Sequence, residues 1–233
     1  MNNSVELIGW YGGDRAIARA AWTSTQIDVD SKTDEQVRDL IVNKLWNNGT
    51  GKPHKTPFER GIVEFNITAD VASHIHLVKH RHLAINGESA RYKELKEDKY
   101  YLPKDWKDVN IDGPYGNLQY ETKEIIDYVG PSWYEILDRY TEIGNELYHR
   151  ALNDLTPVLG RKRAKETARF FKTYNSQITL SVMTNMSCFH NFYSLRADDA
   201  AQDEIHEIAD MMLEIIKNIP GEPFKYTLEA FGF

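Results

Sequence analysis

Cationic side chains are concentrated in residues 79–92, KHRHLAINGESARY. Lys79, Arg81 and Arg91 carry positive charge there, and His80 and His82 stand between them. The chain as a whole is acidic, with a formal net charge of −7. This local cluster therefore predicts a site for a small anion such as a phosphate, and the overall charge argues against a general nucleic-acid surface.

Two further cationic positions stand out in the second half. Residues 161–169, RKRAKETAR, end on Arg169, and the run 161–165 is typical of a solvated helix face. Arg196 follows the apolar and aromatic segment FHNFYSL, so we expect it to be partly buried. A buried guanidinium needs an anionic or hydrogen-bond-accepting partner, and Asp198 is a candidate close by in sequence.

A metal site is disfavoured. His76 and His80 are four residues apart and would share one face of a helix. However, the segment between them is Leu-Val-Lys, so there is no HExxH motif, and Lys79 and Arg81 would repel a cation. No residue is assigned as a metal ligand.

The sequence shows no convincing protein nucleophile and no phosphate-binding glycine loop. Cys188 and His190 are two residues apart on a predicted helix and would point in different directions. A lone cysteine is more often a small buried side chain than a catalyst. Ser89 lacks a G-x-S-x-G context, and GWYGGD near the N-terminus is neither a P-loop nor G-x-G-x-x-G.

The elements that must position these residues begin with a helix and a strand. Thr33 and Gln36 form a possible capping box for a helix over residues 33–49, which Gly49 would end. Residues 62–69, IVEFNITA, alternate apolar and polar side chains as a half-buried strand does. Asp70 is placed to cap a helix running to residue 83, and Asn86-Gly87 would end it. The rest of the cationic segment is then expected to be a loop.

The second half of the chain has a helical pattern. Ser132 and Glu135 predict the start of a helix reaching about Leu152. Further helices are expected over residues 161–171, 179–195 and 200–219, with an irregular stretch over 97–120. The predicted class is α+β in a single domain spanning 1–233, with a small antiparallel sheet confined to the first half and a mostly helical second half.

The remaining features favour a cytoplasmic protein without a membrane partner. The N-terminal residues MNNSVELIGWYGG lack the basic start and long apolar run of a signal peptide. No apolar stretch approaches the length of a membrane span. The single cysteine is compatible with a reducing compartment.

Several motifs together resemble those of the flavin-dependent thymidylate synthases. The family signature has the core R-H-R, seven residues and then Ser; here Lys79-His80-Arg81 is followed by seven residues and Ser89. Residues 54–59, HKTPFE, are similar to the upstream H-x-T-P-F-E of the family. The spacing of the C-terminal half also matches at Arg169, Asn185, Asn191 and the segment LRAD at 195–198.

This resemblance implies an enzyme that converts dUMP into dTMP. The carbon would come from methylenetetrahydrofolate, the hydride from a reduced FAD recharged by NADPH, and the protein would be a homotetramer with active sites shared between subunits. No cysteine adduct would be needed. A fixed guanidinium would instead stabilise the negative charge that develops on the pyrimidine.

The resemblance also implies roles for individual residues. Arg196 would be catalytic and would contact the substrate. FAD would be bound by Thr56, Lys79, His80, Arg81, Asn185 and Asn191. The nucleotide would be bound by His76, Lys79, Ser89, Ala90, Arg91 and Arg169.

The sequence departs from the family pattern at six places. Lys79 replaces an Arg, His76 a Gln, Ala84 a Ser, Gly87 a Glu and Ser187 an Arg, and Phe170-Phe171-Lys172 stands where Leu-Pro commonly follows. These departures leave other functions open. The same flavin chemistry could act on another pyrimidine nucleotide such as dCMP, with methyl or hydroxymethyl transfer, or the chain could bind flavin or nucleotide without turnover. An RNA-binding basic helix is disfavoured by the net charge.

Overall fold

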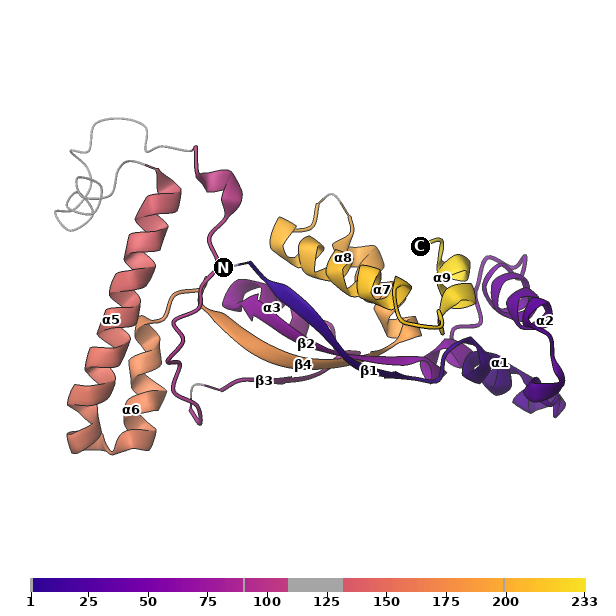
Figure 1. The fold of residues 1–233 in the computed structure, drawn as a ribbon, viewed down its shortest axis with the longest axis horizontal. Coiled ribbons are helices and arrows are strands. Elements are labelled where there is room, and N and C mark those ends of the chain that lie inside the picture. Colours follow the sequence, from indigo (N-terminus) through magenta and orange to yellow (C-terminus); the bar gives the residue numbers. More distant parts are fainter. Residues whose placement is uncertain (1, 90, 109–131, 199) are drawn as a thin grey trace. The chain divides into compact units, whose positions relative to one another are not determined.

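The computed structural model describes residues 2–89, 91–108, 132–198 and 200–233. Contacts within the chain divide it into two compact units. The first comprises residues 1–3, 69–74 and 87–179, and the second comprises residues 4–68, 75–86 and 180–233. Figure 1 shows the elements along the chain, and each unit is described separately below.

The sheet has the strand order β1-β2-β4-β3. Its strands are β1 (Ser4–Tyr11), β2 (Ile62–Asp70), β3 (Ala84–Gly87) and β4 (Gln177–Asn185). β1 and β2 pair in antiparallel fashion, with Leu7 opposite Phe65, and the register shifts between Leu7 and Gly9. Val63, Phe65 and Ile67 are fully buried, as the alternation in this segment predicted.

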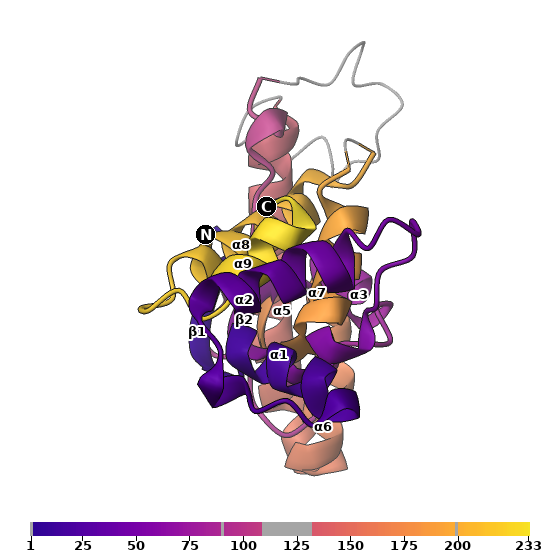
Figure 2. The same cartoon turned by 90° about the vertical axis from the view of Figure 1, so that its right-hand side faces the viewer.

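In the second unit, helices cover one face of the sheet. α7 (Met186–Arg196) and α8 (Asp203–Lys217) lie above the strands in Figure 1, and Figure 2 shows the same elements turned by 90°. α8 follows its predicted pattern and buries Ile205, Ile208 and Met212. α1 (Asp14–Trp22) and α9 (Lys225–Phe231) complete this unit together with the segment formed by α2 (Asp34–Arg38), the π-helical turn η3 (Asp39–Trp46) and η4 (Thr56–Arg60).

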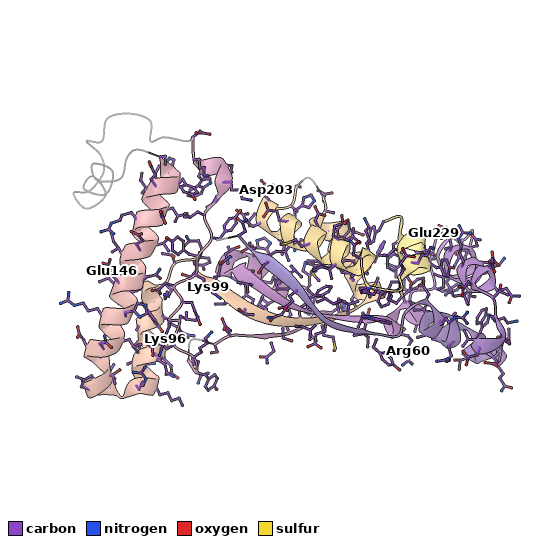
Figure 3. The ribbon with its side chains drawn as sticks, viewed as in Figure 1. Arg60, Lys96, Lys99, Glu146, Asp203 and Glu229 are labelled. Carbon is purple, nitrogen blue, oxygen red and sulfur yellow. The ribbon has the colours of Figure 1, made fainter. Side chains whose placement is uncertain are left out.

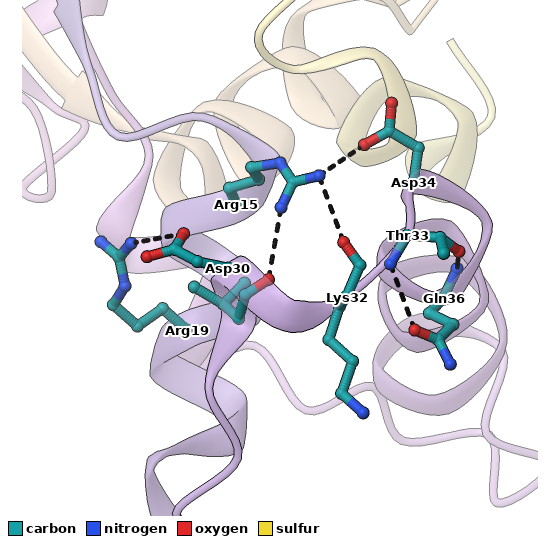
Figure 4. Close-up of polar contacts among 8 residues, drawn as sticks. Arg15, Arg19, Asp30, Lys32, Thr33, Asp34 and Gln36 are labelled. Carbon is teal, nitrogen blue, oxygen red and sulfur yellow. Dashed lines mark hydrogen bonds and ion pairs between the residues drawn. The ribbon is translucent and has the colours of Figure 1, made fainter.

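The predicted capping box at the start of α2 is confirmed. Thr33 Oγ1 accepts a hydrogen bond from the Gln36 amide at 3.4 Å, and Gln36 Oε1 accepts one from the Thr33 amide at 3.1 Å. Figure 4 shows that Arg15 holds the preceding segment, because it donates to the Val29 carbonyl and pairs with Asp34 at 2.8 Å. These contacts fix where the helix begins.

Two acidic side chains fix α9, one on the helix itself and one on α1. Glu229, labelled in Figure 3, forms an ion pair with Arg38 of α2. Asp14 accepts hydrogen bonds from the Tyr226 amide, the Thr227 amide and the Thr227 hydroxyl at the first turn of α9. Burial raises the pKa of the Asp14 carboxyl to about 6, although these hydrogen bonds act in the opposite direction.

In the first unit, α5 (Trp133–Leu159) and α6 (Arg161–Ala168) pack side by side (Figure 1). Tyr148 and Leu152 of α5 pack with Ala164 and Ala168 of α6. As predicted, Ser132 caps α5 by accepting from the Glu135 amide at 3.1 Å, but the helix continues past Leu152 to Leu159. α6 leads into η7 (Arg169–Phe171). A short turn, η5 (Lys104–Trp106), lies in the segment expected to be irregular, and residues 109–131 lie outside the described residues.

The α+β class is confirmed, but two predicted boundaries are wrong. Strands are not confined to the first half, because residues 177–185 form β4 rather than the start of a helix. In this segment Leu180, Val182 and Thr184 are buried while Ser181 and Met183 are exposed, which is the period of a strand. The helix after Asp70 is also shorter than predicted: α3 spans Val71–Val78, and residues 84–87 form β3.

Tertiary contacts account for the early end of α3. Asp70 does cap it, accepting from the Ser73 amide at 2.8 Å. After Val78, two turns with hydrogen bonds to the His76 and Leu77 carbonyls lead directly toward the sheet. Sheet pairing of the next residues has overridden local helix propensity. Of the described helices, none is long and apolar enough to cross a membrane.

Candidate functional site

The predicted site residues fall into two groups, one in each unit. In the second unit these residues are Thr56, His76, Lys79, His80, Arg81, Asn185, Asn191 and Arg196. In the first unit they are Ser89, Arg91 and Arg169, and Ala90 lies outside the described residues. The two groups are considered in turn.

The central contact of the second unit joins His80 to α7. The Arg196 Nε–H donates to His80 Nε2 at 2.9 Å, although the two residues are 116 positions apart. The His80 ring also meets Phe192 edge to face, with centroids 4.9 Å apart. Phe192 and Arg196 are one helical turn apart, so α7 presents both to the same imidazole.

This contact requires a neutral imidazole at Nε2. The pKa of His80 is lowered from its ordinary value by burial, then by the positive charge of Arg196, and least by His76. A neutral ring keeps a lone pair at Nε2 for the Arg196 donor. Arg196 is thereby fixed through Nε, and among the described residues none occupies its two terminal nitrogens, which can therefore meet a ligand.

The partner of Arg196 is His80 and not Asp198, the candidate close by in sequence. Asp198 Oδ1 accepts from the Ala200 amide at 2.9 Å. Within the described part of the chain, Arg196 forms no ion pair with it. The interpretation of Arg196 as half of a local Arg–Asp pair is therefore wrong, and its partner comes from the cationic segment instead.

The cations beside His80 face solvent. Lys79 and Arg81 follow the end of α3 and are exposed. Neither has an ion-pair partner among residues 2–89, 91–108, 132–198 and 200–233. Thr56, on η4, and Asn191, on α7, are exposed as well. Their donors can therefore meet an anionic or polar ligand without breaking existing contacts.

Asn185 has a structural task at the start of α7. Its Oδ1 accepts from the Cys188 amide at 2.9 Å and so caps the helix. The Met186 amide donates to the Gly61 carbonyl at 2.9 Å, which fixes the same turn to the segment after η4. Capping uses only the carbonyl oxygen of Asn185, so its amide group keeps a donor for a ligand.

Neither Cys188 nor His190 is built for nucleophilic chemistry. Burial raises the pKa of the Cys188 thiol despite an opposing hydrogen bond with Asn185, so little thiolate is present at neutral pH. His190 packs among the rings of Trp46, Phe231 and Phe233, and its Nδ1 is buried without a hydrogen-bond partner in the described residues. Burial lowers the pKa of His190 to about 4.

In the first unit, Ser89 begins a tight turn. Its carbonyl accepts from the amides of Tyr92 and Lys93 at 2.9 and 3.0 Å, and its hydroxyl accepts from the Arg91 amide at 3.4 Å. The exposed guanidinium of Arg91 donates through Nε to Glu166 Oε1 at 3.2 Å. The turn thus carries a hydroxyl and an arginine two positions apart in the sequence.

α6 holds this turn, so the run 161–165 is more than a solvated face. Lys165 Nζ donates to the Tyr92 carbonyl at 2.8 Å, and Arg161 forms an ion pair with Glu94. At the other end of α6, Arg169 is exposed at the start of η7. Gly144 of α5 lies beneath η7, where an added Cβ would stand only 2.6 Å from the Phe171 carbonyl oxygen.

The carboxylate of Glu88, next to the departure at Gly87, is bound within the protein. Glu88 Oε2 accepts from the Thr179 amide at 3.0 Å, and Oε1 pairs with Lys93 at 2.6 Å. Burial would raise the pKa of Glu88, but the hydrogen bonds from Lys93 and Thr179 outweigh it and lower the pKa. Its carboxylate is therefore committed to the protein, and Gly87 leaves that position without an acidic group.

Two residues that contact the predicted site were missed in the sequence. Phe192 supports the His80 ring, and Glu166 engages Arg91. The spacing of Phe192 one turn before Arg196 was a usable signal for the first. For Glu166 the signal was weaker: it is an acidic residue between the basic run 161–165 and Arg169.

The chain is similar to known proteins along most of its length. The family model described as thymidylate synthase complementing protein matches residues 6–220. The curated flavin-dependent thymidylate synthase of Thermosipho africanus is 27% identical over 227 residues, which cover 97% of this chain and 90% of that protein. The protein of the same name from Pseudothermotoga lettingae is 28% identical, with 97% and 89% covered.

A solved structure shares the fold along nearly the whole chain. It is that of a UMP/dUMP methylase, PolB from Streptomyces cacaoi, bound with 5-Br dUMP. The TM-score is 0.73 at 26% sequence identity, and 99% of this chain and 95% of that chain are covered. The resemblance found in the sequence motifs is confirmed, and these likenesses support a methyltransferase enzyme. Because the family model spans all but the ends of the sequence, the chain belongs to the thymidylate synthase complementing protein family.

Proposed function

We propose that this enzyme methylates dUMP to dTMP, with methylenetetrahydrofolate as the carbon donor and reduced FAD, recharged by NADPH, as the hydride source. The observation that carries the proposal is the Arg196 guanidinium, which is fixed at 2.9 Å by a neutral His80. A fixed cation of this kind suits a reaction in which negative charge develops on a pyrimidine ring.

Arg196 acts on the pyrimidine through electrostatics. C5 of uracil is a weak carbon nucleophile, and it becomes stronger as negative charge moves into the ring and its carbonyl oxygens. The terminal nitrogens of Arg196 stabilise that charge, while its Nε stays bound to His80. No protein nucleophile is needed, which agrees with the raised pKa of the Cys188 thiol.

The donor set around His80 fits a flavin dinucleotide. Lys79 and Arg81 are exposed and without ion-pair partners in the described residues, so they can neutralise a pyrophosphate. We assign the other contacts with the cofactor to polar side chains on η4, at the end of β4 and on α7: Thr56, Asn185 and Asn191.

The nucleotide is recognised through its phosphate and its base. Arg91 and Arg169 supply charge for the phosphate, and the turn at Ser89 supplies a hydroxyl. We assign the remaining nucleotide contacts to His76, Lys79 and Ala90. Glu88 contributes none, because its carboxylate is used by Thr179 and Lys93.

We further propose a cytoplasmic homotetramer whose active sites are shared between subunits. Cofactor and nucleotide residues stand on segments that are far apart in the sequence, from Thr56 to Arg196. A complete site therefore requires assembly of these segments within or between copies of the chain. Light scattering at micromolar concentration tests this, with an expected mass of about four times 27.0 kDa; an active monomer would contradict it.

UMP is a second candidate substrate. The solved structure of PolB is described as that of a UMP/dUMP methylase, and it covers 99% of this chain at a TM-score of 0.73. The experiment compares transfer of label from methylenetetrahydrofolate to dUMP, UMP and dCMP by FAD-loaded protein. We expect dUMP to have the highest kcat/KM. A preference for UMP would assign the second function, and a preference for dCMP would contradict both.

A further inference from the structure

Arg91 is held by one edge of its guanidinium. Its Nε donates to Glu166 Oε1 at 3.2 Å, and its planar group lies over the Tyr92 ring, 5.6 Å from the ring centroid. Nη1 and Nη2 have no ion-pair partner among the described residues. The two terminal nitrogens of Arg91, which together can bind two oxygens of one ligand, are therefore available.

Glu166 is itself fixed and partly neutralised. Its side chain is only 19% exposed, and its second oxygen lies 3.6 Å from Arg163 Nη1. The hydrogen bond from Arg91 lowers the pKa of Glu166, so the carboxylate is ionised at neutral pH. With Arg163 on its other side, Glu166 can orient Arg91 without giving this surface a net negative charge.

The backbone that carries Arg91 is fixed by the same helix. Lys165, next to Glu166 on α6, donates to the Tyr92 carbonyl at 2.8 Å. Arg161, one turn earlier, pairs with Glu94. α6 therefore sets both the position of the 89–94 turn and the direction of the one arginine in it.

We propose that Glu166 is a positioning residue for nucleotide binding: by occupying the Nε edge of Arg91, it presents Nη1 and Nη2 to the phosphate monoester of the substrate. This inference rests on the proposed function and extends it to the way the phosphate is selected. Glu166 does not touch the reacting atoms. Its contribution is to order a long side chain before the nucleotide arrives, which lowers the entropic cost of binding.

The test measures dUMP binding to FAD-loaded protein by calorimetry, together with steady-state kinetics. Glu166→Ala is expected to raise the Kd and KM for dUMP about three- to tenfold, the cost of ordering one long side chain, with kcat and FAD affinity unchanged. Glu166→Gln keeps an oxygen that can accept from Nε, so its Kd should stay within about twofold of wild type. In an Arg91→Ala background, Glu166→Ala should have no further effect.

A matched control separates orientation from simple attachment of the turn. Glu94→Ala removes the other acidic contact between the turn and α6 but leaves the Arg91 contact intact. If Glu94→Ala weakens dUMP binding as much as Glu166→Ala does, Glu166 only attaches the turn and the inference is wrong. Tighter binding in both Glu166 variants would show that the carboxylate merely repels phosphate, which also overturns it. Wild-type protein that binds no dUMP would contradict the proposed function as well.

Discussion

Arg196 and His80 form a hydrogen bond of 2.9 Å between two side chains that are both cationic or potentially cationic. Burial and the neighbouring Arg196 charge lower the pKa of His80, and the neutral imidazole can accept this hydrogen bond. It joins the end of α7 to the segment after α3. The fold thereby brings together His80 and Arg196, which are 116 positions apart in the sequence.

Replacement of Arg196 by lysine should impair turnover more than folding. Lysine keeps the charge but has no Nε–H to donate to His80 and no planar fork. Loss of one such electrostatic donor lowers kcat about a hundredfold or more. The measurement is kcat alongside the melting temperature. A variant that melts early but turns over normally while folded would remove the catalytic role of Arg196.

The His80–Arg196 contact should make turnover sensitive to acid. The folded pKa of His80 lies below its ordinary value of 6.5, so the contact is fully present above that pH and is lost as the pH falls through the folded pKa. Protonation places two cations against each other and releases Arg196.

The variant His80→Gln tests this dependence. A glutamine oxygen can accept from the Arg196 Nε but does not titrate. The pH profile of kcat in this variant should lack the acid limb that His80 contributes to the wild-type profile. An unchanged acid limb would assign that titration to another group.

His190→Phe should increase acid stability. The neutral, half-buried ring packs among Trp46, Phe231 and Phe233, and its pKa is lowered to about 4 from 6.5. The unfolded chain therefore binds the proton that the folded chain excludes, and stability is lost as the pH falls from 6.5 to 4. The pKa is lower by about 2.5 and each pKa unit corresponds to about 1.4 kcal/mol, so the loss is at most about 3.5 kcal/mol.

The measurement for His190 is the free energy of unfolding of variant and wild type across this pH range. The advantage of the variant should grow as the pH falls. A difference that is constant with pH would show that His190 does not titrate with unfolding. The comparison between the two proteins cancels the titration of the other histidines.

Lys172→Met should destabilise the first unit. The Lys172 side chain is 8% exposed, and its Nζ donates to Asp98 at 2.5 Å and to Asn145 at 2.7 Å. Its removal leaves these acceptors without their charged donor, at a cost of about 1–3 kcal/mol in the free energy of unfolding. Lys96, labelled in Figure 3, is an exposed lysine of the same unit. The control Lys96→Met should change the free energy of unfolding by less than about 0.5 kcal/mol.

The sequence predicted best those features that local chemistry determines. The capping box at Thr33, the caps at Asp70 and Ser132 and the alternation in residues 62–69 all appear in the structure. Each depends on residues within a few positions of one another.

Features set by distant contacts were not predictable in this way. β4 contains Leu180 and Val182 at strand spacing, but the apolar pattern runs without a break into α7 and was interpreted as one helix. The end of α3 depends on the sheet pairing of residues 84–87, which no local pattern reveals. Likewise, Asp198 was the partner of Arg196 nearest in sequence, whereas the actual partner, His80, is brought there by the fold.

The most direct test of the central claim is a single-turnover experiment with FAD-loaded, chemically reduced protein, dUMP and methylenetetrahydrofolate labelled in the methylene carbon. We predict that the label appears at C5 of dTMP in wild type, only when the flavin is reduced, and that Arg196→Lys forms this product at least about a hundredfold more slowly while binding dUMP. Folded, flavin-loaded wild-type protein that binds dUMP and yet transfers no label, or that transfers label equally well without flavin, would contradict the claim.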